Sequence, residues 1–154
     1  MSGKSGRVLK VFLADDDEDD RILFADALSE TGLQIKLEEI KDGNELMRKL
    51  LKEDAALPDI IFLDLNMPSK TGLECLAEIR SRKDLVDIVI IIYSTSANNK
   101  DIEETFYRGA SLYIQKPIRF SDLKETLHKV FDLDWENHKP EAYDEKFAWI
   151  RARP

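Results

Sequence analysis

Charged and hydroxyl side chains stand at the ends of four apolar runs in this chain. Asp15 and Asp16 follow a run near the N-terminus, and Asp64, Ser94 and Lys116 follow three later runs. If these runs are parallel strands, ligands bind at their carboxyl ends, where loops and helix N-termini meet. Three carboxylates, one hydroxyl and one ammonium would then share one edge of a sheet.

This set of groups predicts phosphoryl chemistry assisted by a divalent cation. Three neighbouring carboxylates repel one another unless a cation neutralises them, and Mg²⁺ is held by one or two carboxylates together with a phosphate oxygen. With Mg²⁺ and Lys116 the three acids sum to zero charge, so an incoming phosphoryl group is tolerated. The central acid, Asp64, can attack phosphorus to form an aspartyl-phosphate. Lys116 and the metal would stabilise the transferred oxygens, and Ser94 could donate a hydrogen bond to one of them.

The elements that position these residues follow from hydrophobic periodicity. Apolar runs alternate with segments of helical period, which predicts βαβ units and an α/β fold with a parallel sheet covered on both faces. The predicted strands are Val8–Ala14, Ile35–Ile40, Ile60–Leu63, Ile88–Tyr93 and Leu112–Ile114. The predicted helices carry apolar stripes at Leu23, Phe24, Ala27 and Leu28; at Leu46, Met47, Leu50 and Leu51; at Leu73, Leu76, Ala77 and Ile79; and at Leu123, Leu127, Val130 and Phe131. A shorter helix over Ile102–Tyr107 is closed by Gly109, and Ser121 is expected to cap the last helix.

Composition and charge indicate one globular domain without a disulfide. The chain has 154 residues, a net charge of −8 and a single cysteine. Six consecutive acids, residues 15–20, carry most of the excess negative charge, and no basic stripe marks a nucleic-acid surface. Within this run, Asp19 and Asp20 are interpreted as acids that complement the dipole of a first helical turn. The longest apolar run, Ile88–Tyr93, cannot span a bilayer, so we expect a cytoplasmic protein that binds neither nucleic acid nor membrane.

Four segments of the chain resemble the receiver domain of two-component response regulators, in the family's order and spacing. They are Phe12–Asp17, Pro58–Pro68 with Gly72, Ile90–Thr95, and Gly109–Tyr113 followed by Lys116 and Pro117. The resemblance implies a flavodoxin-like fold, in which a five-stranded parallel sheet of order 2-1-3-4-5 has helices on both faces. It also implies an N-terminal extension (1–7), a receiver domain (8–131) and a C-terminal tail (132–154).

The resemblance assigns a metal site to four residues. Asp15 and Asp16 match the family's acidic pair, with Asp16 as the direct ligand and Asp15 acting through water. Asp64 matches the phosphorylated aspartate, and Asn66 matches the residue whose backbone carbonyl completes the metal shell. The implied cofactor is Mg²⁺.

The resemblance also assigns the phosphoryl contacts and a switch. Ser94 and Lys116 match the hydroxyl and the lysine that contact the phosphoryl group on Asp64. Tyr113 matches an aromatic switch whose ring turns inward as Ser94 moves toward the phosphate. The bond between Lys116 and Pro117 resembles the family's cis peptide.

A protein of this family is expected to be a single-domain response regulator in a two-component system or a phosphorelay. A histidine kinase or a histidine phosphotransfer protein would phosphorylate Asp64, and the domain would then change a protein-binding surface. Because no chain follows the tail, we expect the output to be contact with a downstream protein, made by a monomer or by a phosphorylation-dependent homodimer. Such a phosphoacceptor domain catalyses only its own phosphorylation and dephosphorylation and is not an enzyme in the ordinary sense.

Two alternatives belong to other functional classes. A phosphohydrolase of the haloacid dehalogenase type uses similar chemistry, but it requires a second acid two residues after its nucleophile, where this chain has Asn66. A pseudo-receiver would bind partners without phosphorylation, and the intact set of Asp15, Asp16, Asp64 and Lys116 argues against it.

The aromatic tail requires a separate prediction. Tyr143, Phe147 and Ile150 recur at helical spacing with Trp149 at the edge of the stripe, which favours a short helix. Such a segment is marginal alone and needs a surface on which to pack. We expect it to dock on the surface of the last predicted helix, which borders the face that responds to Tyr113, and we expect phosphorylation to change its protection.

Overall fold

Strands and helices alternate regularly in the computed structural model, which describes residues 8–138 and 146–150. The strands are β1 (Leu9–Ala14), β2 (Ile35–Ile40), β3 (Ile60–Leu63), β4 (Val89–Ser94), β5 (Leu112–Gln115) and β6 (Ala148–Trp149). The helices are α1 (Glu18–Glu30), α2 (Gly43–Leu51), α3 (Gly72–Arg80), α4 (Asn99–Tyr107) and α5 (Phe120–Asp132). The five strands predicted from the apolar runs are confirmed, each to within one residue at either end.

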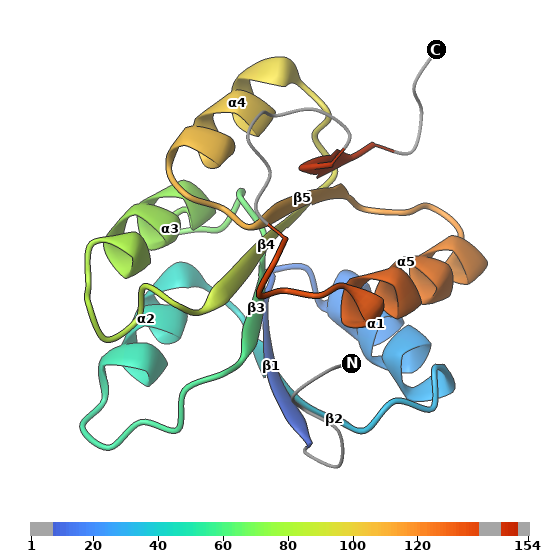
Figure 1. The fold of residues 1–154 in the computed structure, drawn as a ribbon, viewed down its shortest axis with the longest axis horizontal. Helices are drawn as coiled ribbons and strands as arrows, with labels where there is room; N and C mark the ends of the chain where they lie inside the picture. Colours follow the sequence, from blue (N-terminus) through green and yellow to red (C-terminus); the bar gives the residue numbers. More distant parts are fainter. Residues whose placement is uncertain (1–7, 139–145, 151–154) are drawn as a thin grey trace.

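The strands form one parallel sheet in the order β2-β1-β3-β4-β5-β6. The expected order 2-1-3-4-5 is therefore confirmed, and β6 is added at the β5 edge. Figure 1 shows α1 and α5 on one face of the sheet and α2, α3 and α4 on the other side. Because both faces are covered, the side chains of β3 are buried along the whole strand, as expected for a central parallel strand.

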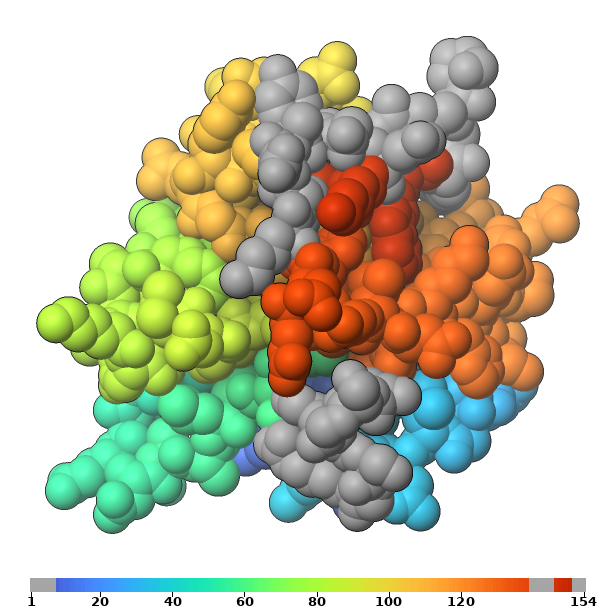
Figure 2. Space-filling model, viewed as in Figure 1, coloured from blue at the N-terminus to red at the C-terminus, as the bar shows by residue number. Residues whose placement is uncertain are grey.

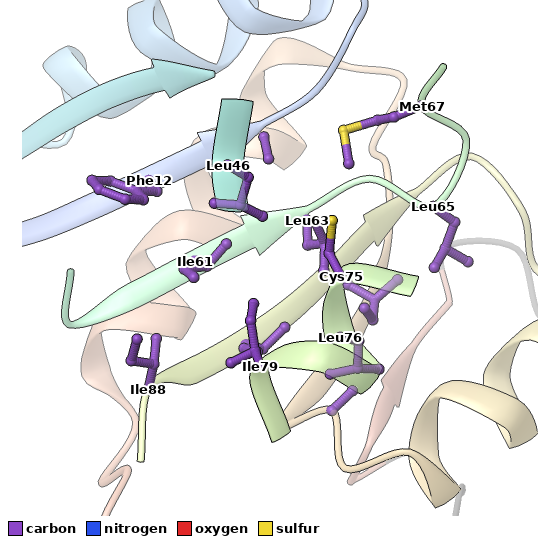
Figure 3. Packing of buried hydrophobic residues seen from close by; sticks show 14 of the residues in the cluster. Phe12, Leu46, Ile61, Leu63, Leu65, Met67, Cys75, Leu76, Ile79 and Ile88 are labelled. Carbon is purple, nitrogen blue, oxygen red and sulfur yellow. The ribbon is translucent and has the colours of Figure 1, made fainter. Parts of the chain in front are cut away.

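Two apolar cores lie on the two faces of the sheet. On the α1 and α5 side, Phe24, Phe62 and Tyr93 pack edge to face, with ring centroids 4.9 to 6.1 Å apart. On the other side, aliphatic residues of β1, β3 and β4 pack against α2 and α3, among them Ile61 and Leu76 (Figure 3). These two cores fix the positions of the strand ends, where the polar residues stand.

Three details of the helix predictions are wrong. Leu23 and Leu51 are 48% and 40% exposed, because each lies beside the buried stripe of its helix rather than within it. On α1 the buried face instead includes Arg21, whose guanidinium makes polar contacts at the edge of the sheet. Ser121 is not a cap: α5 begins at Phe120 after Arg119, and no side chain caps it.

Ala148 and Trp149 of the tail form a short strand rather than part of the predicted helix. Residues 148–149 pair with β5 in parallel, and the amide of Tyr113 donates a 2.8 Å hydrogen bond to the carbonyl of Phe147. A strand is favoured here because the outer edge of β5 would otherwise carry unpaired backbone groups. Tyr143 lies outside the described residues.

The predicted docking of the tail on α5 holds only in part, because β6 pairs with β5 and, within β6, only Trp149 lies on the α5 side of the sheet. Trp149 and Ile150 line a hollow together with α5 residues such as Asp122 and Lys129. Phe147 is fully buried against Tyr113 and Phe106. Figure 1 shows β6 next to β5, and in Figure 2 its red surface adjoins the orange surface of α5. Within residues 8–138 and 146–150, no helix has both the length and the hydropathy needed to cross a bilayer.

Candidate functional site

The carboxyl ends of β1, β3 and β5 bring the predicted chemical groups together. Ala14 and Leu63 are register partners in the β1–β3 pair, so the residues that follow them, Asp15 and Asp64, emerge side by side. The amide of Lys116, just after β5, donates to the carbonyl of Ser94 at 2.7 Å. Strand pairing alone therefore delivers two acids and the lysine to one edge of the sheet.

The backbone around Asp15 is held by a buried arginine of α1. Arg21 Nη1 donates to the Asp15 carbonyl at 2.7 Å, and its Nε lies 3.5 Å from a Glu39 carboxylate oxygen. The amide of Asp17 donates to Asp15 Oδ1 at 2.9 Å. The Asp15 side chain is thus buried and fixed in orientation, whereas Asp16 next to it is exposed.

Asp64 stands at the end of β3 and is only 6% exposed. Its amide donates to the Ala14 carbonyl at 2.9 Å, and the amide of Asn66 lies 3.4 Å from its Oδ1. The backbone of Gly72, at the start of α3, passes so close that a Cβ there would lie 2.1 Å from the Asp64 carbonyl oxygen. A glycine is therefore needed at the start of α3 for Asp64 to occupy this position.

Lys116 is surrounded by carboxylates. Its Nζ lies 2.7 Å from Asp20 Oδ2 and 2.8 Å from Asp15 Oδ2, and a longer contact of 3.4 Å reaches Asp64 Oδ2. Burial lowers the pKa of Lys116, but the carboxylates of Asp15, Asp20 and Asp64 outweigh burial, and the net pKa is raised. The ammonium is therefore charged at neutral pH and is the local counter-ion of the acidic group.

The acids form a group that can hold a metal ion. Asp15, Asp16 and Asp64 each offer a carboxylate oxygen, and these three oxygens lie within 4.8 Å of one another. Asp15 Oδ2 is buried, and the Lys116 ammonium lies 2.8 Å from it. A buried acceptor of this kind, in an all-oxygen set, fits a hard divalent cation. Asn66 is exposed at the rim of the group.

The pKa of Asp64 is raised to about 6. Burial is the main cause, the charge of Asp15 adds to it, and Lys116 opposes it. A buried acid with this pKa is still ionised at pH 7, but its charge is costly without a cation. Both the raised pKa of Asp64 and the three neighbouring carboxylates indicate that a cation would stabilise this site.

Ser94 and Tyr113 are linked through Ser96. The amide of Ser96 donates to Ser94 Oγ at 3.1 Å, and the carbonyl of Ser96 accepts from the Tyr113 hydroxyl at 3.0 Å. The Ser96 hydroxyl in turn donates to Asp101 of α4 at 2.7 Å. One residue thus links the end of β4, the ring on β5 and the start of α4.

Two sequence expectations about this region are wrong. The peptide bond between Lys116 and Pro117 is trans, the form that is lower in energy for most bonds to proline. Asp20 is more than an acid that complements the helix dipole, because its side chain contacts Lys116 and adds a fourth carboxylate to the group. Asp20 lies three residues after the N-cap Asp17, on the first turn of α1. Helical geometry could therefore have predicted that Asp20 lies near the strand ends, but it could not have predicted the contact with Lys116.

The structure is a parallel α/β sheet with three carboxylates and a lysine at its carboxyl edge. Residues 11–128 match the family model described as response regulator receiver domain. The chain therefore belongs to the response regulator receiver domain family of two-component signalling. Proteins of this family are phosphoacceptor signalling domains that bind a divalent metal, rather than ordinary enzymes.

Individual relatives agree with this assignment. The response regulator Rcp1 of Synechocystis sp. is 31% identical over 127 residues, which is 80% of this chain and 86% of Rcp1. The crystal structure of the phosphorylated cyanobacterial phytochrome response regulator RcpA superposes with a TM-score of 0.76 at 33% identity and covers 86% of this chain and 97% of that one. The Mn²⁺-bound form of Rcp1 gives a TM-score of 0.74 at 27% identity, covering 87% and 99% of the two chains.

Proposed function

We propose that this protein is a single-domain response regulator that accepts a phosphoryl group on Asp64 with the help of Mg²⁺. The observation that carries the proposal is the position of Asp64, which is buried at the end of β3 between Lys116 and the acids of β1. The receiver unit is residues 8–131, and the match over 86% of Rcp1 is in keeping with a domain that works by itself.

In the proposed reaction, one carboxylate oxygen of Asp64 attacks the phosphorus of the donor. A bond forms between that oxygen and phosphorus, and the bond between phosphorus and the leaving group breaks. With acetyl phosphate, the leaving group departs as acetate and no proton needs to move. Lys116 is already charged and buried beside Asp64, so it can hold the transferred oxygens without a costly rearrangement.

The metal ligands in this proposal are Asp16 and Asp64, with Asp15 acting through a bound water and Asn66 through its backbone carbonyl. When bound, Mg²⁺ neutralises charge on the phosphoryl oxygens. The three acids, whose oxygens lie within 4.8 Å of one another, support a cation at this place, and the Mn²⁺-bound form of Rcp1 supports a divalent one. Arg21 contributes by holding the Asp15 backbone in place.

Output in this proposal passes through Ser94 and Tyr113. If Ser94 turns toward a phosphoryl oxygen, as the family resemblance implies, the contact between its hydroxyl and the amide of Ser96 changes. Ser96 also holds the Tyr113 hydroxyl and Asp101, so its movement alters β5 and α4 together. The surface formed by α4, β5 and α5 would then bind a downstream protein or a second copy of the chain.

The proposed donor is a histidine kinase or a histidine phosphotransfer protein in the cytoplasm. For the test we use acetyl phosphate, because it removes the need to know the partner. Intact-mass analysis with Mg²⁺ is expected to show the gain of one phosphoryl group, and Asp64→Asn is expected to abolish the gain. An equal gain in Asp64→Asn would assign the acceptor to another residue, and no gain in the wild-type protein would overturn the proposal.

A further inference from the structure

Among the three carboxylates around the Lys116 ammonium, Asp20 makes the shortest contact, although neither the acidic pair nor the metal group includes it. The Nζ to Oδ2 distance is 2.7 Å and has hydrogen-bond geometry, compared with 3.4 Å to Asp64. The two residues are 96 positions apart in sequence, and the contact joins the first turn of α1 to the end of β5. Such a contact between distant elements depends on the tertiary fold rather than on helix capping.

The cap of α1 is formed by a different acid. Asp17 is the N-cap and accepts a hydrogen bond from the amide of Asp20, so the side chain of Asp20 does not cap the helix. Its carboxylate is 32% exposed and reaches inward to an ammonium that is 8% exposed. An acid needed only for solvation or for the helix dipole would gain nothing from this inward orientation.

We propose that Asp20 is a positioning residue that holds the Lys116 ammonium in place for phosphoryl transfer to Asp64; this inference rests on the proposed function. Asp15 and Asp20 contact the ammonium at nearly equal distances, and a longer contact reaches Asp64. An ammonium sits on a flexible stem, so two carboxylates at 2.7 and 2.8 Å restrict its position relative to Asp64. In this arrangement the contact with Asp64 can pass to a phosphoryl oxygen while the two shorter contacts stay in place.

Loss of Asp20 has two consequences that act in the same direction. Lys116 loses one of its two short contacts and gains rotational freedom, so its donor is less well directed. It can also move closer to Asp64 and form a tighter ion pair, which occupies an oxygen needed for attack on phosphorus. Both effects slow the acceptance of a phosphoryl group, whereas removal of one negative charge alone would speed the approach of an anionic donor.

The neighbouring acid Asp19 provides a matched control. It lies in the same first turn of α1, carries the same charge and is exposed to solvent. Asp19→Ala and Asp20→Ala therefore change the net charge equally, and only the second removes the contact with Lys116. Asp20→Asn keeps an oxygen that can accept from the ammonium and guards against a folding defect in the alanine variant.

The first measurement is the rate of phosphoryl gain by intact mass, with acetyl phosphate and Mg²⁺. We expect Asp20→Ala to be slower than Asp19→Ala by about tenfold, the effect of one lost hydrogen bond to a charged group. Asp20→Asn is expected to recover part of the rate. A rate for Asp20→Ala equal to or above that of Asp19→Ala would overturn the inference, even though wild-type phosphorylation would still support the proposed function.

The second measurement needs neither metal nor phosphoryl donor. A hydrogen-bonded lysine ammonium exchanges slowly enough to give a ¹H–¹⁵N signal at low temperature, and Lys116→Arg identifies the signal of Lys116 by its loss. We expect this signal in the wild-type protein and in Asp19→Ala, and its loss in Asp20→Ala. A signal retained in Asp20→Ala would show that Asp20 does not hold the ammonium, whatever the outcome of the phosphorylation assay.

Discussion

The amide of Tyr113 donates a 2.8 Å hydrogen bond to the carbonyl of Phe147, and the two rings lie with their centroids 6.5 Å apart. The residue assigned to the switch is therefore covered by the last described segment of its own chain. The same ring hydroxyl is bound to Ser96, next to the phosphoryl site. Tyr113 thus contacts Ser96, near the proposed phosphoryl site, through its hydroxyl and contacts β6 through its backbone.

The first prediction is that phosphorylation loosens β6. If Ser96 shifts when Ser94 turns toward a phosphoryl oxygen, Tyr113 loses its hydroxyl partner, and the amide of Tyr113 should exchange faster with solvent. Hydrogen exchange on residues 146–150 and Tyr113, with and without a phosphoryl mimic and Mg²⁺, measures the effect. Leu37 on β2, at the opposite edge of the sheet, is the internal control.

A reference for the undocked strand comes from Phe147→Ala, which removes a fully buried ring. Its exchange pattern shows what a released β6 looks like. If the phosphoryl mimic leaves the Tyr113 amide as protected as before, β6 has no part in the switch.

The second prediction concerns pH and the stability of the metal-free domain. The pKa of Asp64 is about 6 in the folded protein against an ordinary value of 3.8, mainly because of burial. Between these values the folded state binds more protons than the unfolded state, so the free energy of unfolding falls as pH rises. The loss is fully present above pH 6 and amounts to about 3 kcal/mol.

Urea unfolding in EDTA from pH 4 to pH 7 tests this prediction. In Asp64→Asn the side chain carries no charge, so its burial has no pH-dependent cost. We therefore expect the variant to match the stability of the wild-type protein near pH 4 and to be more stable than it at pH 7. Parallel pH profiles for the two proteins would contradict the assignment of a raised pKa to Asp64.

The third prediction is that Asp16→Ala weakens Mg²⁺ binding and phosphorylation together. Asp16 is the exposed member of the three-acid group, and its loss removes a direct ligand while Asp15 and Asp64 stay in place. We expect at least about a tenfold weaker affinity, since even partners that only orient metal ligands are worth that much. Calorimetric titration with Mg²⁺ measures it, with Asp19→Ala as the charge-matched control. Equal weakening in both variants would indicate general attraction of cations instead of ligation.

The fourth prediction is that Gly72→Ala impairs phosphoryl acceptance at Asp64. A Cβ at residue 72 would lie 2.1 Å from the Asp64 carbonyl oxygen, so the backbone of the acceptor must shift. Small displacements of a reacting group are costly, and we expect the rate to fall by about tenfold or more. Intact-mass kinetics with acetyl phosphate provide the measurement.

Gly32→Ala is the control for this fourth prediction. Gly32 has open space around its Cα but a φ of +74°, so alanine there costs backbone strain of about 1 kcal/mol away from the site. It should lower stability and leave the phosphorylation rate unchanged. A normal rate in Gly72→Ala would mean that the β3–α3 connection adapts without moving Asp64.

The strands, the fold class and the strand-end acids were determined by local sequence. A continuous apolar run such as Ile60–Leu63, set between segments of helical period, is typical of a central strand in a covered parallel sheet, and the residue that follows such a strand stands at its carboxyl edge. Asp15, Asp64 and Lys116 were predictable for this reason, because each is placed by the end of its own strand.

Only the tertiary structure decided the contacts between distant surfaces. The link from Asp20 to Lys116 requires α1 and β5 to meet at a particular distance, which no periodicity in the sequence specifies. The tail is the clearer case: the spacing of Phe147 and Ile150 suits a helix, yet the open edge of β5 offers backbone hydrogen bonds that a helix could not use. Propensity is a weak preference for so short a segment, and the unpaired edge of a neighbouring strand determined its conformation.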